Sequence, residues 1–203
     1  MTDRLLVVTD RRATAGRPLA EVVSAAIAGG ARLIQLREKD LEGRALHALA
    51  VELARIAHDC GARLLINDRV DVALAAGADG VVLPADSLPV DAVRQLVGSK
   101  RMIARSTHSP EEVARAADDG ADLALFGPVF ATPSKAAYGA PQGIERLRQA
   151  CRTPLPVLAV GGIDATNAAQ AIAAGASGVA VIRAVMAAPD PAAAVREILA
   201  AIS

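Results

Sequence analysis

The chain has 203 residues, and its 22 lysines and arginines balance its 22 aspartates and glutamates, so the formal net charge is zero. This balance excludes a general electrostatic attraction to nucleic acid or to an anionic membrane, so any anion site has to be built locally. Cys60 and Cys151 form no CxxC motif, and no apolar run comes near the length of a membrane helix, about 18 residues or more. We therefore expect a cytoplasmic protein without a disulfide or a metal cage, which binds neither nucleic acid nor membranes.

Apolar runs of strand length recur along the chain, and Ala-rich amphipathic stretches separate them. In chain order the runs are "LLVV" (5–8), "RLIQLR" (32–37), "RLLIND" (63–68), "GVVLP" (80–84), "MIA" (102–104), "DLALFG" (122–127), "LPVLAV" (155–160) and "GVAVI" (178–182). Most follow a glycine that is typical of a helix end. Continuous apolar strands indicate a parallel sheet that is buried on both faces. Eight such units predict a (β/α)8 barrel with a single domain over residues 1–203, and a doubly wound open sheet is the alternative.

The second run ends in polar residues, at the strand end where a barrel of this type carries its ligand site. Gln35, Arg37 and Lys39 alternate along the chain, so their side chains face the same side. A planar guanidinium near an ammonium group suits a diphosphate, or a phosphate together with a carboxylate. We therefore predict an anion site here rather than a solvated strand end.

The third run ends in Asn67 and Asp68, and the aspartate has two interpretations. Its carboxylate can bind Mg²⁺, which needs only one or two carboxylates when substrate oxygens complete its shell. It can equally cap the helix that we expect to begin at Arg69. The residues by themselves leave both interpretations open.

Ser106 and His108 follow the fifth run. An imidazole at this position can act as a general acid or base, although it can also serve only as a hydrogen-bonding group of the loop. The other two histidines, His47 and His58, fall on the helix expected between the second and third strands. His108 is therefore the candidate for proton transfer.

A long loop, "FGPVFATPSKAAYG" (126–139), follows the sixth strand and predicts a mobile lid over the barrel mouth. Its candidate anion ligands are Thr132, Ser134 and Lys135, and Lys135 is also a catalytic candidate. Phe130 and Tyr138 offer surfaces on which a flat heterocycle can stack, whereas Phe126 belongs to the core.

The last two strands end in "AVGGI" and "VIRA", at the pair of strands where such barrels bind phosphate through backbone N–H groups. Gly161 and Gly162 permit a close approach of the backbone to the ligand. We predict a phosphate site between these glycines and Ile182–Arg183.

A series of these stretches resembles the thiamine phosphate synthase and TenI family, in order and over essentially the whole chain. They are "LVVTD" (6–10), "QLREKD" (35–40), "INDRVDVAL" (66–74), "STH" (106–108), "FGPVFATPSK" (126–135), "AVGGI" (159–163) and "GVAVIRA" (178–184). The resemblance implies a (β/α)8 barrel that acts on a small-molecule substrate, thiazole phosphate. The synthase branch joins it to hydroxymethylpyrimidine diphosphate and releases pyrophosphate. The TenI branch isomerises the thiazole carboxylate phosphate to its aromatic tautomer.

The resemblance also implies ligand roles for individual residues. The implied diphosphate side consists of Gln35, Arg37, Lys39, Asn67, Ser106, Thr132, Ser134 and Lys135. Asp68 is the implied Mg²⁺ ligand, and Gly162, Ile182 and Arg183 are implied to hold the thiazole phosphate. Mg²⁺ is required only for the synthase reaction, no other cofactor is expected, and a homo-oligomer remains open.

The sequence departs from the synthase pattern at three places. Ser87, in "VLPADS", stands where synthases carry the Asp that is their second Mg²⁺ ligand, and Asp86 would need a shift of one residue to replace it. Arg105 is typical of the TenI branch, and Arg183 stands where synthases usually carry Ser. We therefore predict a TenI-like thiazole tautomerase in which His108 transfers the proton. The alternatives are a thiamine phosphate synthase and, third, a non-catalytic regulator that binds thiazole or thiamine phosphate.

Overall fold

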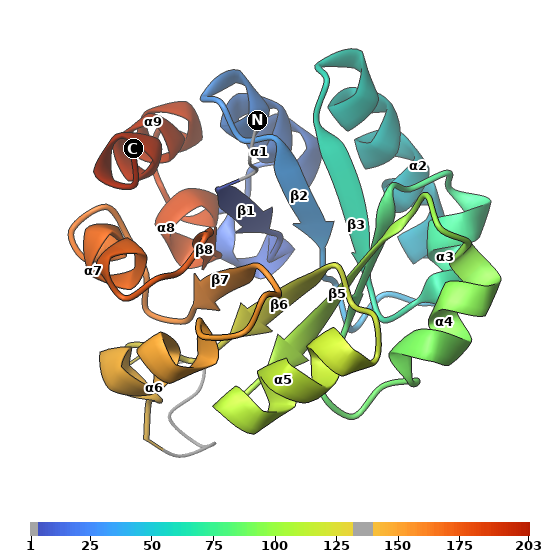
Figure 1. Cartoon of the computed structure of the whole chain (residues 1–203). Helices are drawn as coiled ribbons and strands as arrows, with labels where there is room; N and C mark the ends of the chain where they lie inside the picture. Colours follow the sequence, from blue (N-terminus) through green and yellow to red (C-terminus); the bar gives the residue numbers. More distant parts are fainter. Residues whose placement is uncertain (1–3, 132–139) are drawn as a thin grey trace.

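The computed structural model describes residues 4–131 and 140–203, and its strands form a ring that helices surround (Figure 1). The strands are β1 (Leu5–Val8), β2 (Leu33–Leu36), β3 (Arg63–Asn67), β4 (Gly80–Leu83), β5 (Met102–Thr107), β6 (Leu123–Phe126), β7 (Val157–Val160) and β8 (Gly178–Val181). The helices are η1 (Arg11–Ala13, a 3₁₀ helix), α1 (Leu19–Ala28), α2 (Gly43–Asp59), α3 (Val70–Ala75), α4 (Val90–Val97), α5 (Pro110–Asp118), α6 (Gly143–Ala150), α7 (Ala168–Ala173), α8 (Arg183–Met186) and α9 (Pro191–Ala201).

Each strand pairs in parallel with the next one along the chain, and β8 pairs in parallel with β1, so the barrel is closed. Leu6 lies opposite Leu33 of β2, and Leu5 lies opposite Val179 of β8. The predicted (β/α)8 barrel is confirmed, and the alternative of an open, doubly wound sheet is wrong.

Two strand boundaries differ by more than one residue from the ends of the apolar runs. β5 continues beyond Ala104 to Thr107, because its polar end pairs with β6 up to the Thr107–Phe126 pair. β7 begins at Val157 rather than at Leu155, since Pro156 has no N–H to donate to a neighbouring strand. Its carbonyl still accepts a 2.9 Å hydrogen bond from the N–H of Ala124. The extension of β5 carries Ser106 up to the barrel mouth.

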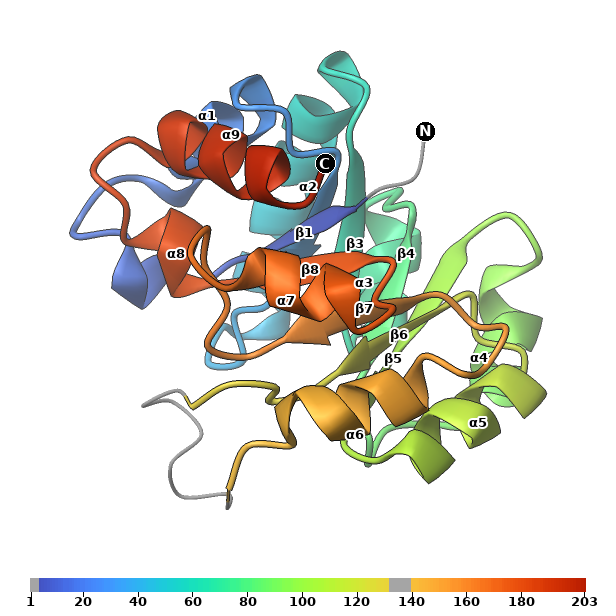
Figure 2. The same cartoon turned by 60° about the vertical axis from the view of Figure 1, so that its left-hand side comes forward.

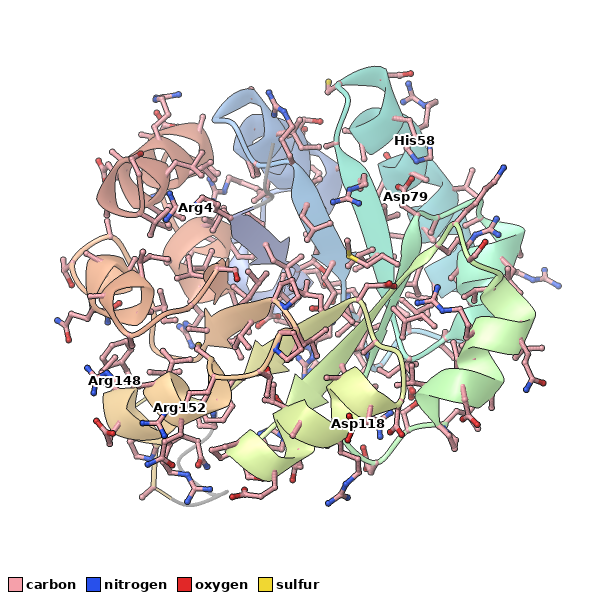
Figure 3. The ribbon with its side chains drawn as sticks, viewed as in Figure 1. Arg4, His58, Asp79, Asp118, Arg148 and Arg152 are labelled. Atoms are coloured by element: carbon pink, nitrogen blue, oxygen red, sulfur yellow. The ribbon has the colours of Figure 1, made fainter. Side chains whose placement is uncertain are left out.

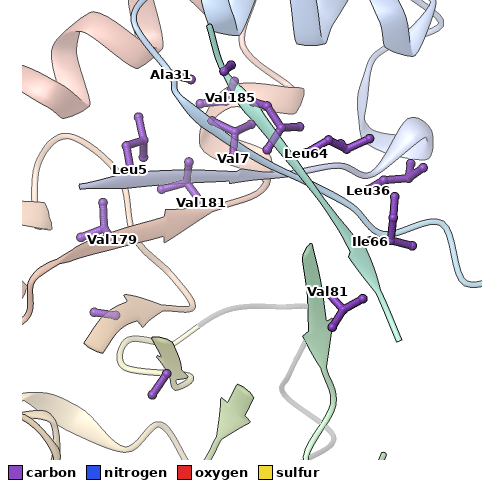
Figure 4. Close-up of a cluster of buried hydrophobic side chains, with 14 of the residues drawn as sticks. Leu5, Val7, Ala31, Leu36, Leu64, Ile66, Val81, Val179, Val181 and Val185 are labelled. Carbon is purple, nitrogen blue, oxygen red and sulfur yellow. The ribbon is translucent and has the colours of Figure 1, made fainter. Parts of the chain in front are cut away.

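The alternation of side chains along each strand builds two hydrophobic layers. One layer fills the barrel with residues from every strand: Leu6, Val8, Leu33, Leu65, Val82, Ala104, Leu123, Leu125, Leu158 and Ala180. The other lies between the barrel and its helices, and Figure 4 shows Leu5, Val7, Leu64, Ile66, Val179 and Val181 of this layer together with Val185 of α8. Polar residues at inward positions beyond the inner layer therefore lie at the mouth of the barrel.

Two aspartates, each preceded by Gly-Ala, hold the opposite end of the barrel. Asp79 accepts a 2.8 Å hydrogen bond from the N–H of Leu64 and lies 2.9 Å from Nε2 of His58, which points toward it from α2 (Figure 3). Asp122 accepts a 2.7 Å hydrogen bond from the N–H of Ile103. Both carboxylates bind backbone N–H groups at the end of the barrel opposite the mouth, so their role is to hold neighbouring strands together.

The last helix closes the ring of helices next to the first. Asp190 caps α9 by accepting a 2.9 Å hydrogen bond from the N–H of Ala193, and Pro191 occupies the first helical position, where no N–H is needed. α9 packs against α1, and the two helices lie side by side in Figure 2. Among the described residues, no helix has the length and apolarity that a membrane span requires.

Candidate active site

An amide pair marks the inner wall of the barrel mouth. Gln35 of β2 is 3 % exposed, and its Nε2 donates a 3.1 Å hydrogen bond to Oδ1 of Asn67 on β3. Both residues occupy inward positions just beyond the inner apolar layer, as the alternation of Leu33 with Gln35 and of Leu65 with Asn67 requires. Since Oδ1 of Asn67 accepts this bond, its Nδ2 group keeps its hydrogens for a ligand in the mouth.

The four charges after β2 divide into two pairs. Glu38 is buried and accepts hydrogen bonds from the backbone N–H and from Nη1 of Arg11, each of 3.0 Å. Asp40 accepts two hydrogen bonds of 2.6 Å from the guanidinium of Arg11, and it accepts a further one from Arg12. The two carboxylates therefore tie the loop after β1 to the loop after β2.

The basic members of the same run are not used in this way. Within the described residues, neither Arg37 nor Lys39 has its side chain in an ion pair, whereas the N–H of Arg37 donates a 2.9 Å hydrogen bond to Oγ1 of Thr9. The backbone is thus fixed while both positive charges remain for a ligand. The anion site at these residues stays a prediction, and the buried Glu38–Arg11 contact fixes the loop beside it.

Asp68 does not cap the helix that follows it. α3 begins at Val70, and Arg69 is its N-cap residue without a side-chain capping bond. Asp68 has a φ of +64°, its N–H donates to the carbonyl of Val82 at 2.9 Å, and its Oδ1 accepts a hydrogen bond from the hydroxyl of Ser87. The capping interpretation is therefore wrong, and the carboxylate reaches across to the loop after β4.

A cavity of about 240 Å³ lies between the loops after β2 and β3. Its lining residues are Leu36, Glu38, Lys39, Leu41, Leu46, Asn67, Asp68 and Arg69. Arg69 was not among the predicted site residues, although it directly follows Asp68 in the sequence. It donates hydrogen bonds of 2.8 and 2.5 Å to the two oxygens of Asp71, and these bonds lower the pKa of that carboxyl.

His108 follows the inward Ser106 at the end of β5, and it is exposed. Its Nδ1 lies 2.5 Å from the carbonyl oxygen of Gly127, and its backbone N–H donates to Glu112 at 2.6 Å. A carbonyl only accepts, so Nδ1 carries a proton and Nε2 is the basic nitrogen of the neutral ring. The two interpretations of this histidine are thus compatible, because the loop hydrogen bond itself fixes the tautomer that a base requires. His47 and His58 lie on α2, as expected.

The loops after β7 and β8 are neighbours, since Val160 pairs with Ala180. Gly161 and Gly162 have φ values of +98° and +67°, and the carbonyl of Gly162 accepts a 2.7 Å hydrogen bond from Nδ2 of Asn167. Ile182 and Arg183 form the start of α8 in the adjacent loop. The two predicted halves of the phosphate site therefore lie on adjacent strands.

The loop after β6 begins and ends beside these glycines. The N–H of Phe130 donates to the carbonyl of Gly161 at 3.0 Å, and the N–H of Gln142 returns to the carbonyl of Pro128 at 2.7 Å. Phe126 is fully buried, as expected. The remaining predicted residues of this loop, Thr132, Ser134, Lys135 and Tyr138, lie outside the described residues, and so does the part of the predicted lid from residue 132 to residue 139.

The comparison with known proteins agrees with the order of these strand-end motifs. Residues 5–185 match the family model described as thiamine monophosphate synthase. The chain belongs to this family. The resemblance seen in the sequence is therefore confirmed over nearly its full extent.

Individual members of the family support the same assignment. A thiamine-phosphate synthase from a Roseiflexus species is 49 % identical to the chain, covering 97 % of it and 84 % of the relative. One from Moorella thermoacetica is 43 % identical, covering 96 % and 93 %. The solved structure of a thiamine phosphate pyrophosphorylase from Pyrococcus furiosus superposes with a TM-score of 0.90 at 35 % identity, covering 99 % of this chain and 96 % of that one.

Oxygen ligands at the mouth fit a divalent cation that a substrate helps to hold. Within residues 4–131 and 140–203, no three His, Cys, Asp or Glu side chains are arranged to bind a metal ion by themselves. Asp68 and Ser87 nevertheless present a carboxylate and a hydroxyl to each other across two loops. Mg²⁺ prefers such oxygen ligands and is usually bound by one or two carboxylates plus substrate phosphates. The donor set therefore fits Mg²⁺ only together with a phosphorylated ligand.

Proposed function

We propose that the chain is a thiamine phosphate synthase, which joins hydroxymethylpyrimidine diphosphate to thiazole phosphate and releases pyrophosphate. The observation that carries this proposal is a group of polar side chains around one end of a closed barrel: Gln35, Asn67, Asp68 and Lys39. The relatives of the chain are named as synthases. The relatives thus support the alternative of the sequence analysis better than its first choice, the tautomerase.

The chemistry requires stabilisation of a leaving group. When the C–O bond to the diphosphate breaks, negative charge develops on the departing pyrophosphate, and the remaining pyrimidine carbocation is captured by the ring nitrogen of thiazole phosphate. Preorganised donors aimed at developing charge are the strongest general source of such stabilisation. Arg37, Lys39 and the Nδ2 group of Asn67 supply these donors. The family resemblance adds Ser106 and three residues outside the described part of the chain: Thr132, Ser134 and Lys135.

Asp68 would hold Mg²⁺, and the ion would supply positive charge that neutralises part of the charge on the departing pyrophosphate. The thiazole phosphate would lie at the other side of the mouth, against the backbone N–H groups of Gly162, Ile182 and Arg183. This arrangement puts the two substrates at opposite sides of one opening, so that the reacting carbon and nitrogen can meet above the inner layer.

Synthase activity is tested with both substrates and Mg²⁺, following thiamine phosphate and pyrophosphate together. We expect both products in equal amounts, with activity that depends strongly on Mg²⁺ and is lowered by about 10²-fold or more in Asp68→Asn. Ser87→Asp, which supplies the carboxylate that other synthases carry, should raise the activity at low Mg²⁺. Absence of both products at saturating substrates and Mg²⁺ would exclude the synthase.

The second candidate is the thiazole tautomerase, and the hydrogen bond between His108 and the carbonyl of Gly127 favours it. This bond leaves Nε2 as the nitrogen that accepts a proton. If the chain aromatises the thiazole carboxylate phosphate, His108→Ala and His108→Gln should slow that reaction by about 10²-fold, the usual contribution of a general base. Ultraviolet absorbance of the aromatic thiazole measures the rate. The matched control is His47→Ala on α2, and equal rates in all variants would exclude this candidate and favour a binding role.

A further inference from the structure

The guanidinium of Arg105 binds the backbone of the loop after β4. Nη2 donates a 2.9 Å hydrogen bond to the carbonyl of Ala85, and Nη1 donates one of 2.9 Å to the carbonyl of Leu88. Arg105 is fixed in register on β5 by its pairing with Leu83, at an outward position between the inward Ala104 and Ser106. The planar guanidinium of Arg105, held on a strand, therefore binds both ends of this loop.

Ser87 lies between the two carbonyls that Arg105 binds. It is half-buried, whereas Ala85, Asp86 and Leu88 around it are exposed. Its N–H donates to the carbonyl of Pro84 at 3.1 Å, which closes a turn, and its hydroxyl donates to Oδ1 of Asp68. The side-chain contact from this loop to Asp68, the proposed cation ligand, thus comes from Ser87, which lies between the two residues that Arg105 binds.

Asp68 depends on β4 and its loop at two points. Its N–H donates to the carbonyl of Val82 at 2.9 Å, and its carboxylate accepts from Ser87. Asp68 holds a φ of +64°, an uncommon conformation for a residue other than glycine. The hydroxyl of Ser87 is the side-chain group of the described residues that donates a hydrogen bond to this carboxylate.

We propose that Arg105 is a positioning residue: it fixes the loop of residues 84–88 and thereby holds the Ser87 hydroxyl on the Asp68 carboxylate. The inference deepens the proposed function, on which it rests, because Asp68 is the proposed cation ligand. Within the described residues, residues 85–88 make three kinds of hydrogen bond. They are the turn bond from the N–H of Ser87, the two bonds from Arg105, and the bond from the Ser87 hydroxyl to Asp68. Exposed loop residues with few contacts open easily, so loss of the fork should free this loop.

The test uses Arg105→Lys and Ser87→Ala. Lysine keeps the positive charge but cannot bind two carbonyls as a fork, so Arg105→Lys separates positioning from electrostatics. The first measurement is the affinity for Mn²⁺, as a spectroscopic substitute for Mg²⁺, in the presence of pyrophosphate. The second is the rate of hydrogen exchange of residues 84–88. The third compares the change in the Mg²⁺ activation constant of the synthase reaction with the change in its kcat.

Each single variant should weaken Mn²⁺ binding by about 10-fold, the lower end of the effect of groups that orient a metal ligand. Arg105→Lys should also speed exchange in residues 84–88, and it should raise the Mg²⁺ activation constant more than it lowers kcat. The double variant should be no worse than either single variant, because both act through one contact. The matched control is Arg94→Lys: Arg94 also binds loop carbonyls, those of Gly98 and Arg101, but at the opposite end of the barrel. It should lower Tm without changing Mn²⁺ affinity.

Three results would overturn the inference: unchanged or tighter Mn²⁺ binding in Arg105→Lys, additive losses in the double variant, or no Mn²⁺ binding by the wild-type protein with pyrophosphate. A failure of the synthase proposal can be told apart from a failure of the inference about Arg105. If the wild-type protein forms no thiamine phosphate but binds Mn²⁺ with pyrophosphate, the synthase proposal falls while the binding and exchange measurements still decide the role of Arg105.

Discussion

The side-chain amide of Gln35 donates its 3.1 Å hydrogen bond to Asn67 from inside the barrel, where Gln35 is almost fully buried. Replacement by methionine keeps a similar volume but removes the donor. We expect Gln35→Met to change the free energy of unfolding by only about 1 kcal/mol, the net value of a neutral hydrogen bond. Synthase turnover should fall by about 10-fold or more, because the amide of Asn67 loses its fixed orientation toward the diphosphate.

Chemical denaturation and steady-state kinetics measure the two effects. Gln170→Met, on the exposed surface of α7, is the control and should change neither quantity. Wild-type kinetics in Gln35→Met would show that the Gln35–Asn67 pair plays no part in ligand binding.

The Arg11–Asp40 contact makes stability depend on pH. Hydrogen bonds from the Arg11 guanidinium hold the pKa of the Asp40 carboxyl well below its usual value of 3.8. The unfolded chain therefore takes up a proton at a higher pH than the folded protein does. The stabilisation is complete above about pH 5 and is lost as the pH falls through the usual value toward the lowered pKa.

Asp40→Asn should accordingly be less stable than the wild type at neutral pH, and this difference should shrink below about pH 4. Urea unfolding at a series of pH values measures it. Asp59→Asn is the control, because Asp59 belongs to an exposed pair with Arg55 that salt and water screen. A difference between Asp40→Asn and the wild type that stays constant from neutral pH to pH 3 would contradict the prediction.

Two glycines with nearly the same φ allow backbone strain to be separated from an effect on ligand binding. Gly162 has a φ of +67° and Gly77 one of +69°, but a Cβ on Gly162 would lie 2.6 Å from the carbonyl oxygen of Ala131, while a Cβ on Gly77 meets nothing within 4 Å. Gly77→Ala should cost about 1 kcal/mol of stability from backbone strain alone. Gly162→Ala should cost more and should also raise the KM for thiazole phosphate by about 10-fold, since it disturbs the proposed phosphate loop.

Thermal unfolding and substrate titrations compare the two variants directly. An equal KM in Gly162→Ala and Gly77→Ala would place the thiazole phosphate away from the loop after β7.

The two cysteines should differ in reactivity. Burial raises the pKa of the Cys151 thiol to about 11, whereas Cys60 is exposed. Because only the thiolate is nucleophilic, alkylation of Cys151 by iodoacetamide at pH 8 should be about 10²-fold slower than that of Cys60. Mass spectrometry of the two peptides follows both rates, and Cys60→Ser removes the fast phase. Similar rates in the folded protein would show that Cys151 is not shielded as described.

The sequence by itself predicted the barrel, because its strand runs and glycine turns are local signals that repeat along the chain. The same local periodicity predicted that Gln35, Arg37 and Lys39 face one side of their strand, since side chains alternate along a strand. It also located His108 at the mouth, from its place just after a strand. Each of these predictions depends only on the spacing of residues within one short segment of the chain.

Only the tertiary structure decided which polar groups pair with one another. The capping interpretation of Asp68 fails because its partner, Ser87, lies on the loop of another strand. Glu38 is neutralised by Arg11, a residue 27 positions earlier in the chain. Arg105, which entered the sequence analysis as a marker of one branch of the family, binds the loop that carries Ser87. Loop residues have no periodic pattern from which their contacts could be predicted. Closure of the barrel brings loops from distant parts of the chain together, so these contacts depend on the folded structure.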